Sequence, residues 1–230
     1  MYALVIAGGR GERLKPLTDS RPKPMVEVLG KPFLEYHLRW LKKFGVTHAV
    51  LLIGYLGEVV KDYFLDGSRL GMEISYSIEY SPLGRGGALR QGFSHVPNTE
   101  GVVVATNGDV FSDEDLSKVV SSHNDSGCLA TIMLVPLISP FGIVDADDDG
   151  LVTKFREKPR LPHWVNGGVY IFNREIERML PELGDHEDST FPRLAEEGKL
   201  GSFKSEKYWR SIDSVKDLGE VESAITGRIA

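Results

Sequence analysis

Apolar runs of strand length alternate with segments of helical periodicity through the first half of the chain. The run from Tyr2 to Ala7 is continuously apolar, which is typical of a parallel strand buried on both faces. The segment from Phe33 to Phe44 places leucines on one helical face, and Gly45 follows it, as glycine often does at a helix end. The other strand-like runs are 49–53, 74–78 and 102–105, and the other helical runs are 57–64, 88–95 and 112–120, the last capped by Ser112. This alternation predicts a doubly wound α/β sheet.

The pattern changes after about residue 128. Strand-like segments at 129–135, 142–144, 151–155 and 169–172 follow one another without long helices between them. They predict a mixed or antiparallel extension packed on the first half, and the segment from Val215 to Ile225 predicts a closing helix. No repeat, low-complexity tract or linker divides residues 1–230, so we expect a single domain.

Composition narrows the choice of partners. The 230 residues carry a net charge of −6, so we expect no basic surface for nucleic acid. Cys128 is the only cysteine, which excludes a disulfide within the chain and fits a reducing cytoplasm. No apolar segment approaches the roughly 20 residues of a membrane-spanning helix, so we expect no membrane partner and a cytoplasmic location.

Glycines follow the first strand directly, at Gly8, Gly9 and Gly11. Because they lack side chains, they let the backbone approach a ligand and turn N–H groups toward it, as in an anion-binding nest. Arg13 and Lys23 add two positive charges beside this loop. The spacing is neither that of a P-loop nor that of the dinucleotide-binding fingerprint, whose third glycine is replaced here by a leucine. The sequence therefore predicts an anionic ligand at the end of the first strand.

An aspartate is expected at the same edge of the sheet. Asp109 follows the strand-like run 102–105 after a short turn through Asn107 and Gly108. It should therefore lie at the carboxyl end of a parallel strand, where ligands bind in open α/β sheets. Since Mg²⁺ prefers carboxylate oxygens among protein ligands, Asp109 is the first candidate for a metal ligand.

The segment from Gly8 to Pro24 resembles the signature of the sugar-1-phosphate nucleotidyltransferase family. The likeness continues in the family's order over nearly the whole chain, at Gly30–Tyr36, Pro82–Ala88, Asn107–Asp109, Glu157–Pro159 and Asn166–Phe172. The overall look is similar to the small guanylyltransferases that act on heptose or mannose 1-phosphates, although uridylyl- and thymidylyltransferases share most of these motifs. The resemblance implies the nucleotide-diphospho-sugar transferase type of fold, a Rossmann-like mixed sheet with inserted sugar-binding β elements. It implies a nucleotide-binding core at about 1–127 and a sugar-binding and closing part at about 128–230.

The resemblance also implies an enzyme that uses Mg²⁺ to join a sugar 1-phosphate to a nucleoside triphosphate, with release of pyrophosphate. By the family's motifs, Arg13 and Lys23 are the catalytic cations. The residues implied for nucleotide binding are Ala7, Gly8, Gly9, Gly11, Arg13, Glu79, Gly84 and Gly108. The residues implied for binding the sugar phosphate are Gly142, Glu157, Lys158, Asn166 and Gly167. The implied metal ligands are Asp109 and Asp213.

The second metal ligand departs from the common pattern. Many relatives carry Trp-x-Asp-x-Gly, whereas here the acid stands two places later, in the run from Tyr208 to Ser214. Some family members, including cytidylyltransferases, carry this later aspartate, so Asp213 is assigned as the second ligand. The alternative is that Asp213 is only the N-terminal acid of the following helix.

Glu79 is predicted to read the nucleotide base, because it ends the third strand shortly before Gly84, the position from which relatives read the base edge. A carboxylate only accepts hydrogen bonds, so it suits guanine, which offers two adjacent donors, and it can accept the single N3–H of uracil or thymine. GTP is therefore the expected donor and UTP or dTTP the alternative, with CTP and ATP poor. The simpler interpretation is an exposed strand-end acid, and Arg85 is unusual in the adjoining loop.

A non-catalytic protein that binds sugar nucleotides and regulates a partner is the rival from another class. Such a protein would be expected to lose Arg13, Lys23 or Asp109, and all three are present. An NAD-dependent oxidoreductase is disfavoured by Leu14 and by the absence of an acid at the end of the second strand. The identity of the sugar and the oligomeric state, with a homodimer among the options, stay open.

Overall fold

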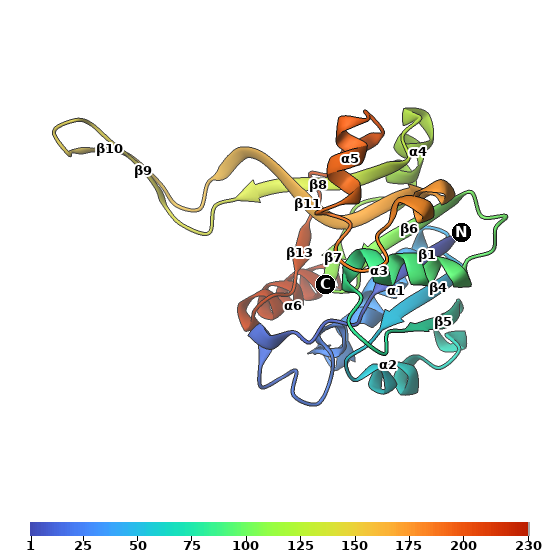
Figure 1. Ribbon diagram of the computed structural model, residues 1–230. Coiled ribbons are helices and arrows are strands. Elements are labelled where there is room, and N and C mark those ends of the chain that lie inside the picture. Colours follow the sequence, from blue (N-terminus) through green and yellow to red (C-terminus); the bar gives the residue numbers. More distant parts are fainter. Residues whose placement is uncertain (230) are drawn as a thin grey trace.

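A seven-stranded sheet forms the centre of the computed structural model, which describes residues 1–229 (Figure 1). Its strands lie in the order β12-β8-β11-β6-β1-β4-β5. Neighbouring strands pair in parallel except at β11, which is antiparallel to both β6 and β8. Their bounds are β1 Tyr2–Ile6, β4 His48–Ile53, β5 Glu73–Ile78, β6 Val102–Asn107, β8 Ala130–Ile138, β11 Arg160–Asn173 and β12 Leu200–Lys204. The predicted doubly wound α/β fold with a mixed sheet is confirmed.

Helices cover both faces of this sheet. Core residues of α1, α2 and α4 pack on one face, and those of α3 and α5 pack on the other. The helices are α1 Phe33–Lys43, α2 Gly57–Phe64, α3 Gly84–Gly92, α4 Leu116–Ser126, α5 Thr190–Glu196 and α6 Val215–Ile229. Short 3₁₀ helices lie at Glu12–Leu14 (η1), Lys23–Met25 (η2), Ser68–Leu70 (η3), Phe93–His95 (η4) and Arg174–Met179 (η5). Within residues 1–229, none of these helices has the length and apolar character that crossing a membrane requires.

Successive side chains of the central strands point to opposite faces, which explains the two cores. In β1, Ala3 and Val5 belong to the core under α1, whereas Leu4 belongs to the core under α3. All three side chains are fully buried. A strand covered on both faces needs an apolar residue at every position, and this is the pattern of the sequence.

Two short strand pairs and the last helix hold the loop that follows β1. β7 (Val110–Ser112) pairs with β13 (Trp209–Ser211), and β2 (Glu27–Val28) pairs with β3 (Lys31–Pro32). α6 packs against this region through a third core, made of Leu14, Val26, Val28, Phe33, Ile212, Leu218, Val221 and Ile225. The C-terminal helix therefore covers the loop that carries the glycine-rich motif.

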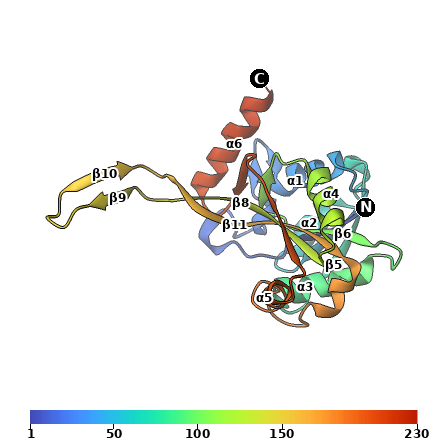
Figure 2. The same ribbon diagram turned by 90° about the horizontal axis from the view of Figure 1, so that it is seen from above.

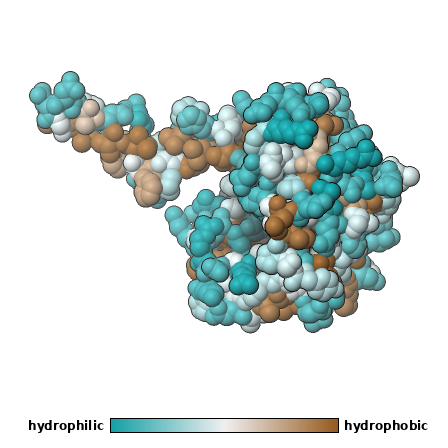
Figure 3. All heavy atoms as spheres, in the orientation of Figure 1, coloured by the Kyte–Doolittle hydropathy of each residue, from teal (hydrophilic) through white to brown (hydrophobic). Residues whose placement is uncertain are grey.

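A hairpin of β9 (Ile143–Ala146) and β10 (Val152–Arg156) extends away from the body of the molecule, as Figures 1 and 2 show. We call residues 139–159 the arm. Apolar groups lie along it in Figure 3, and its exposed apolar side chains are Phe141, Val144, Leu151, Val152 and Phe155. β11 carries the chain back from the arm into the main sheet.

The start of α4 differs from the prediction. Ser112 does not cap this helix, because it ends β7, and α4 begins only at Leu116. The N-cap is Asp115, whose carboxylate accepts a hydrogen bond from the amide of Ser117 at 3.0 Å. The pairing of β7 with β13 decides this difference, and such a long-range contact is not visible in the local pattern.

The core under α1 gives a test of the fold. Leu38 is fully buried there, so Leu38→Ala is expected to lower the free energy of unfolding by about 2–5 kcal/mol through lost contacts and a residual cavity. Leu151 on the arm is 67% exposed, and Leu151→Ala should change that free energy by less than about 0.5 kcal/mol. Urea unfolding followed by circular dichroism measures both, and equal effects would contradict this description of the core.

Candidate active site

The loop that leaves β1 makes close contact with two charged side chains. A Cβ atom on Gly8 would lie 3.1 Å from the amide nitrogen of Gly54 and 3.3 Å from Oε1 of Glu79. Gly11 has a φ of 65°, and a Cβ atom there would lie 2.7 Å from Cβ of Lys23. A larger residue would not fit at Gly11, and at Gly8 it would require its neighbours to shift by a few tenths of an ångström. The glycines therefore allow one loop to touch both Glu79 and Lys23.

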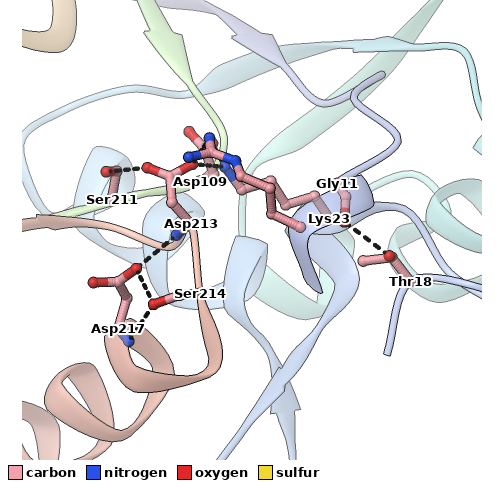
Figure 4. A network of polar contacts seen from close by, with 9 residues as sticks. Gly11, Thr18, Lys23, Asp109, Ser211, Asp213, Ser214 and Asp217 are labelled. Carbon is pink, nitrogen blue, oxygen red and sulfur yellow. Dashed lines mark hydrogen bonds and ion pairs between the residues drawn. The ribbon is translucent and has the colours of Figure 1, made fainter. Parts of the chain in front are cut away.

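Lys23 joins two carboxylates, as Figure 4 shows. Its Nζ donates to Oδ2 of Asp109 at 2.5 Å and to Oδ1 of Asp213 at 2.7 Å. A guanidinium nitrogen of Arg13 donates to the same Oδ1 of Asp213 at 2.7 Å. The structure thus brings four predicted site residues into direct contact, from the loop after β1, the turn after β6 and the segment after β13.

Backbone and hydroxyl contacts fix Asp213 beside Asp109. The amide of Ile212 donates to the carbonyl oxygen of Asp109 at 3.0 Å. The hydroxyl of Ser211 donates to Oδ2 of Asp213 at 2.8 Å. At the start of α6, the acid that accepts hydrogen bonds from the helix entry is Asp217, which accepts from the amide of Asp213 at 3.1 Å. The Asp213 carboxylate itself points to Lys23 and not to the helix (Figure 4).

Charge pairing fixes the protonation states in this cluster. Burial alone would lower the pKa of Lys23, but the charge of Asp109 and the hydrogen bonds to both carboxylates raise it above its ordinary value. Burial would raise the pKa of Asp213, but hydrogen bonds from Lys23 and Ser211 and the nearby positive charges lower it. Lys23 is therefore a cation and Asp213 an anion at neutral pH.

A pocket of about 410 Å³ opens beside this cluster, and we call it the first pocket. The predicted residues that line it are Gly9, Arg13, Lys23, Asp109, Asn166, Gly167 and Asp213. The lining residues that the prediction missed are Ile6, Pro24, Arg85, Asn107, Val110, Gly168, Trp209 and Ser211. The indole N–H of Trp209 donates to the carbonyl of Gly167 at 2.8 Å. Trp209 and Ser211 precede Asp213 at alternate positions, and this period of two is the signal that could have found them.

A second pocket, of about 470 Å³, lies around Glu79. It is lined by Gly8, Arg10, Gly54, Tyr55, Glu79, Tyr80, Ser81 and Pro82. Burial raises the pKa of the Glu79 carboxyl above its ordinary value. The hydrogen bond that Oε2 accepts from the amide of Leu83 at 3.0 Å lowers this pKa, but by less than burial raises it. Glu79 is thus partly buried in a concave site and is not the exposed strand-end acid of the simpler interpretation. Gly8 lines this pocket and Gly9 the first, so the two pockets are neighbours along one loop.

The glycine-rich segment at the start of α3 packs against another part of the chain. The amides of Gly86 and Gly87 donate to the carbonyl oxygen of Gly184 at 2.9 and 3.2 Å. The amide of Gly184 donates to the carbonyl of Leu83 at 2.7 Å, and a Cβ atom on Gly84 would lie 2.7 Å from the carbonyl carbon of Gly184. This packing starts α3 before the expected residue 88. The same packing explains why residues 84, 86 and 87 are glycines, since a Cβ atom at each would lie too close to the segment 181–186. Nucleotide binding by Gly84 stays a prediction.

Three residues expected to bind the sugar phosphate lie elsewhere. Gly142, Glu157 and Lys158 belong to the arm near its junction with the sheet, and they line neither pocket. Glu157 and Lys158 form an ion pair at 3.5 Å with side chains 61% and 50% exposed. The structure therefore does not place them with Asn166 and Gly167, and their contact with substrate stays a prediction.

Ala7 and Gly108 shape the backbone at the ends of two strands. The amide of Ala7 donates to the carbonyl of Leu52 at 2.8 Å, and the side chain is buried. The amide of Gly108 donates to the carbonyl oxygen of Ile6 at 2.9 Å. A Cβ atom on residue 108 would also lie 2.9 Å from that oxygen. These two residues therefore set the course of the backbone beside Gly8 and Asp109.

Asp109 and Asp213 are the carboxylates that converge on one cation. Within residues 1–229, no group of three or more His, Cys, Asp or Glu side chains is arranged to hold a metal ion. The ammonium group of Lys23 nevertheless shows that oxygens of the two aspartates can share one positive charge. This pair fits a Mg²⁺ that takes its remaining ligands from phosphate groups and water.

Comparisons with known proteins place this geometry in a family. The family model described as nucleotidyl transferase matches residues 2–228. The chain is 39% identical over 177 residues to the D-glycero-alpha-D-manno-heptose 1-phosphate guanylyltransferase of Campylobacter jejuni. This match covers 76% of this chain and 77% of that protein. The chain is also 32% identical over 248 residues to the UTP–glucose-1-phosphate uridylyltransferase of Synechocystis, and this match covers 99% of this chain. The chain spans 64% of the length of that relative.

A solved structure has a similar fold over nearly the whole chain. The crystal structure of HddC from Yersinia pseudotuberculosis complexed with GMP-PN has a TM-score of 0.77 and 25% sequence identity to this chain. The match covers 97% of this chain and 99% of that one. The sheet order, the glycine-rich loop at the end of β1 and the match over residues 2–228 lead to one assignment. The chain belongs to the nucleotidyl transferase family.

Proposed function

We propose that this chain transfers a nucleotidyl group from a nucleoside triphosphate to a sugar 1-phosphate and releases pyrophosphate. The observation that carries the proposal is Lys23 held between Asp109 and Asp213, in a pocket that Arg13 and Gly9 also line. A heptose 1-phosphate guanylyltransferase and a UTP–glucose-1-phosphate uridylyltransferase among the relatives support it.

The reaction joins two anions, so it needs charge neutralisation and alignment more than a covalent intermediate. A phosphate oxygen of the sugar 1-phosphate attacks the α-phosphorus of the triphosphate, and the bond to the leaving pyrophosphate breaks. No general base is required, because the attacking phosphate is already ionised. Arg13 would stabilise the charge that develops on the pyrophosphate, and Lys23 would hold the α-phosphate or the acceptor phosphate.

Asp109 and Asp213 would hold the Mg²⁺, whose charge offsets that of the phosphates when it is bound. Both carboxylates are now paired with Lys23, and Asp213 is also paired with Arg13. Lys23 would give up its place between the carboxylates and turn its ammonium group to a phosphate oxygen in the same pocket. The side chain that now neutralises the aspartates is therefore also the cation available to the substrate.

Glu79 is the proposed reader of the base, with GTP as the preferred donor. Its Oε2 accepts from the amide of Leu83, which leaves Oε1 for the donors of the base. Guanine presents N1–H and the N2 amine together, whereas cytosine and adenine present an unprotonated ring nitrogen at that edge. The guanylyltransferase relative and the GMP-PN in the HddC structure support guanine, and the uridylyltransferase relative supports UTP or dTTP as the alternative.

A 1-phosphate of the heptose or mannose type is the proposed acceptor, from the likeness to the heptose 1-phosphate enzyme of Campylobacter jejuni. Asn166 and Gly167 line the first pocket together with Lys23, which suits a sugar phosphate bound there. A screen of pyrophosphate release, with every nucleoside triphosphate against a panel of sugar 1-phosphates and Mg²⁺, tests the whole proposal. Nucleotide binding without release by any pair would instead indicate a non-catalytic binding protein.

The metal assignment predicts the effect of Asp109→Ala. Loss of a partner behind a metal ligand costs about 10- to 100-fold, so loss of a ligand itself should lower kcat by more than about 100-fold. Asp125→Ala, on the exposed surface of α4, is the control and should be active. Pyrophosphate release over a Mg²⁺ titration measures the effect, with thermal melting to show that the fold is kept. Wild-type rates at saturating Mg²⁺ would remove Asp109 from the metal site.

Arg13→Ala is expected to lower kcat by about 100-fold with a smaller change in KM for the nucleotide, because its contact strengthens as charge develops. Arg21, paired with Glu27 at 2.6 Å and outside both pockets, offers a matched control in Arg21→Ala. Steady-state kinetics with saturating acceptor separate the two constants. A change in KM alone would make Arg13 a ground-state binder.

Base selection depends on Glu79 in this proposal. In competition between equimolar triphosphates, the wild type should use GTP best, and Glu79→Gln should reduce the preference for GTP over CTP by about tenfold or more. Gln keeps the size of the side chain but adds a donor where only acceptors stood. Best use of CTP or ATP by the wild type would refute the base assignment, and an unchanged preference in Glu79→Gln would show that another residue reads the base.

A further inference from the structure

Arg85 lines the first pocket, but the chemistry proposed above does not use it. It lies in the first turn of α3 and shares the pocket with Lys23 and Asn166. Its guanidinium donates from NH2 to Oδ2 of Asp185 at 2.7 Å and from Nε to the same oxygen at 3.1 Å. Its NH1 donates to Oε2 of Glu187 at 2.8 Å. Two carboxylates from the segment after η5 therefore hold this one side chain.

Glu187 links Arg85 to Asn166. Its Oε1 accepts from Nδ2 of Asn166 at 2.9 Å and from the hydroxyl of Tyr170 at 2.8 Å. The Oδ1 of Asn166 accepts from the amide of Gly168 at 2.9 Å. The two pocket-lining side chains, one from α3 and one from β11, are thus fixed relative to each other by a single carboxylate.

Backbone hydrogen bonds hold Arg85 to the same segment. The amide of Arg85 donates to Oδ1 of Asp185 at 2.8 Å, and the next amide, that of Gly86, donates to the carbonyl of Gly184. Arg85 is therefore held at its backbone and at its guanidinium by the same neighbouring segment. A side chain ordered in this way loses little conformational entropy when a ligand binds to it.

Arg85 keeps donors for a ligand. A guanidinium has five N–H donors, and the contacts with Asp185 and Glu187 use one each on Nε, NH1 and NH2. One N–H on NH1 and one on NH2 are not used by these carboxylates. The side chain is 39% exposed, so these donors are within reach of a molecule in the pocket.

The charge here favours hydroxyl groups over phosphate. One guanidinium faces the two carboxylates of Asp185 and Glu187, so the cluster carries a net negative charge. The net negative charge of this cluster would repel a phosphate group placed beside it. A sugar hydroxyl, in contrast, can donate to a carboxylate and accept from the N–H groups of Arg85 that the two carboxylates do not use.

We propose that Arg85 is a specificity-determining residue that binds ring hydroxyls of the acceptor sugar, and that Asp185 and Glu187 are positioning residues that hold it. The inference rests on the proposed function. It places the phosphate of the acceptor at Lys23 and the neutral, hydroxylated ring toward Arg85 and Asn166.

Arg90 provides a matched control for the test. It lies on the same helix, is also 39% exposed and pairs with Glu182 at 3.3 Å, but it lines neither pocket. Arg85→Ala should raise KM for the sugar 1-phosphate by about tenfold or more and leave KM for the nucleotide within about twofold. It should also reduce the kcat/KM ratio between the best sugar 1-phosphate and its epimer. Arg90→Ala should change none of these values.

Two further variants separate binding from structure. Arg85→Lys should not restore the acceptor KM, because a lysine ammonium cannot reproduce the planar fork held by two carboxylates. Glu187→Gln should raise the acceptor KM without changing the nucleotide KM, since it loosens Arg85 and Asn166 together. Arg85→Gln, which keeps a polar side chain of similar length, is measured in the same way if Arg85→Ala fails to fold.

The outcomes distinguish this inference from the function on which it rests. Absence of pyrophosphate release by the wild type with every pair of substrates would overturn both. An active wild type, with acceptor kinetics of Arg85→Ala equal to those of Arg90→Ala, would overturn the inference alone. A change in the nucleotide KM instead of the acceptor KM would do the same, since Arg85 would then face the donor.

Discussion

A single ammonium group ties together three segments that lie far apart in the sequence. Nζ of Lys23 is shared by Asp109 and Asp213, so the loop after β1 is held against the turn after β6 and the segment after β13. Two carboxylates without a cation between them would repel each other and would favour protonation of one of them. The third apolar core packs Leu14 and Ile212 with residues of α6, so it also holds the loop after β1 against the segment after β13. The Lys23 ammonium group is thus a contact that all three segments share at the wall of the first pocket.

The direction of β11 explains why the second half of the chain reaches this pocket. β11 runs antiparallel to β6, with Val169 opposite Thr106, so the residues before Val169 continue past the carboxyl end of β6. That end leads directly to Asp109. Asn166 and Gly167 are therefore carried to the edge where the parallel strands end, although β11 itself returns from the arm. A parallel strand at this place would bring its other end to the pocket.

Local patterns in the sequence were sufficient for much of the fold and for part of the site. The continuous apolar run of β1, the glycines after it and the position of Asp109 after β6 can all be recognised within a few neighbouring residues. The partners of Arg85 could not be, because Asp185 and Glu187 stand about 100 residues away and look like ordinary surface acids in the sequence. The prediction that Ser112 caps a helix is wrong for the same reason, since its pairing with β13 is a contact over a long sequence separation.

Glycine motifs show a second limit of sequence reasoning. At both Gly8 and Gly84 another group lies close to the position of a Cβ atom, tightly at Gly8 and too closely for any Cβ at Gly84. At Gly8 the neighbours include the carboxylate of a pocket residue, Glu79, whereas at Gly84 the neighbour is the backbone of Gly184. A ligand and a neighbouring backbone segment can both require that a residue has no Cβ atom. A glycine in the sequence therefore does not tell which of the two lies beside it. The start of α3 consequently resembles a binding loop while its amides are satisfied within the chain.

The balance of positive and negative side chains differs between two parts of the first pocket, in a chain whose net charge is −6. Arg13 and Lys23 are offset by Asp109 and Asp213, so the two cations become available to phosphate only when the carboxylates are neutralised in another way, the role proposed for Mg²⁺. The cluster around Arg85 carries one more carboxylate than cation, and nothing proposed for the metal changes that. The proposed function therefore places phosphate at Arg13 and Lys23 and not at the cluster around Arg85. In the proposed function, an acceptor with a single phosphate on a neutral ring would have one orientation that satisfies both parts, and this orientation would direct its phosphate oxygens toward the nucleotide beside the glycine-rich loop.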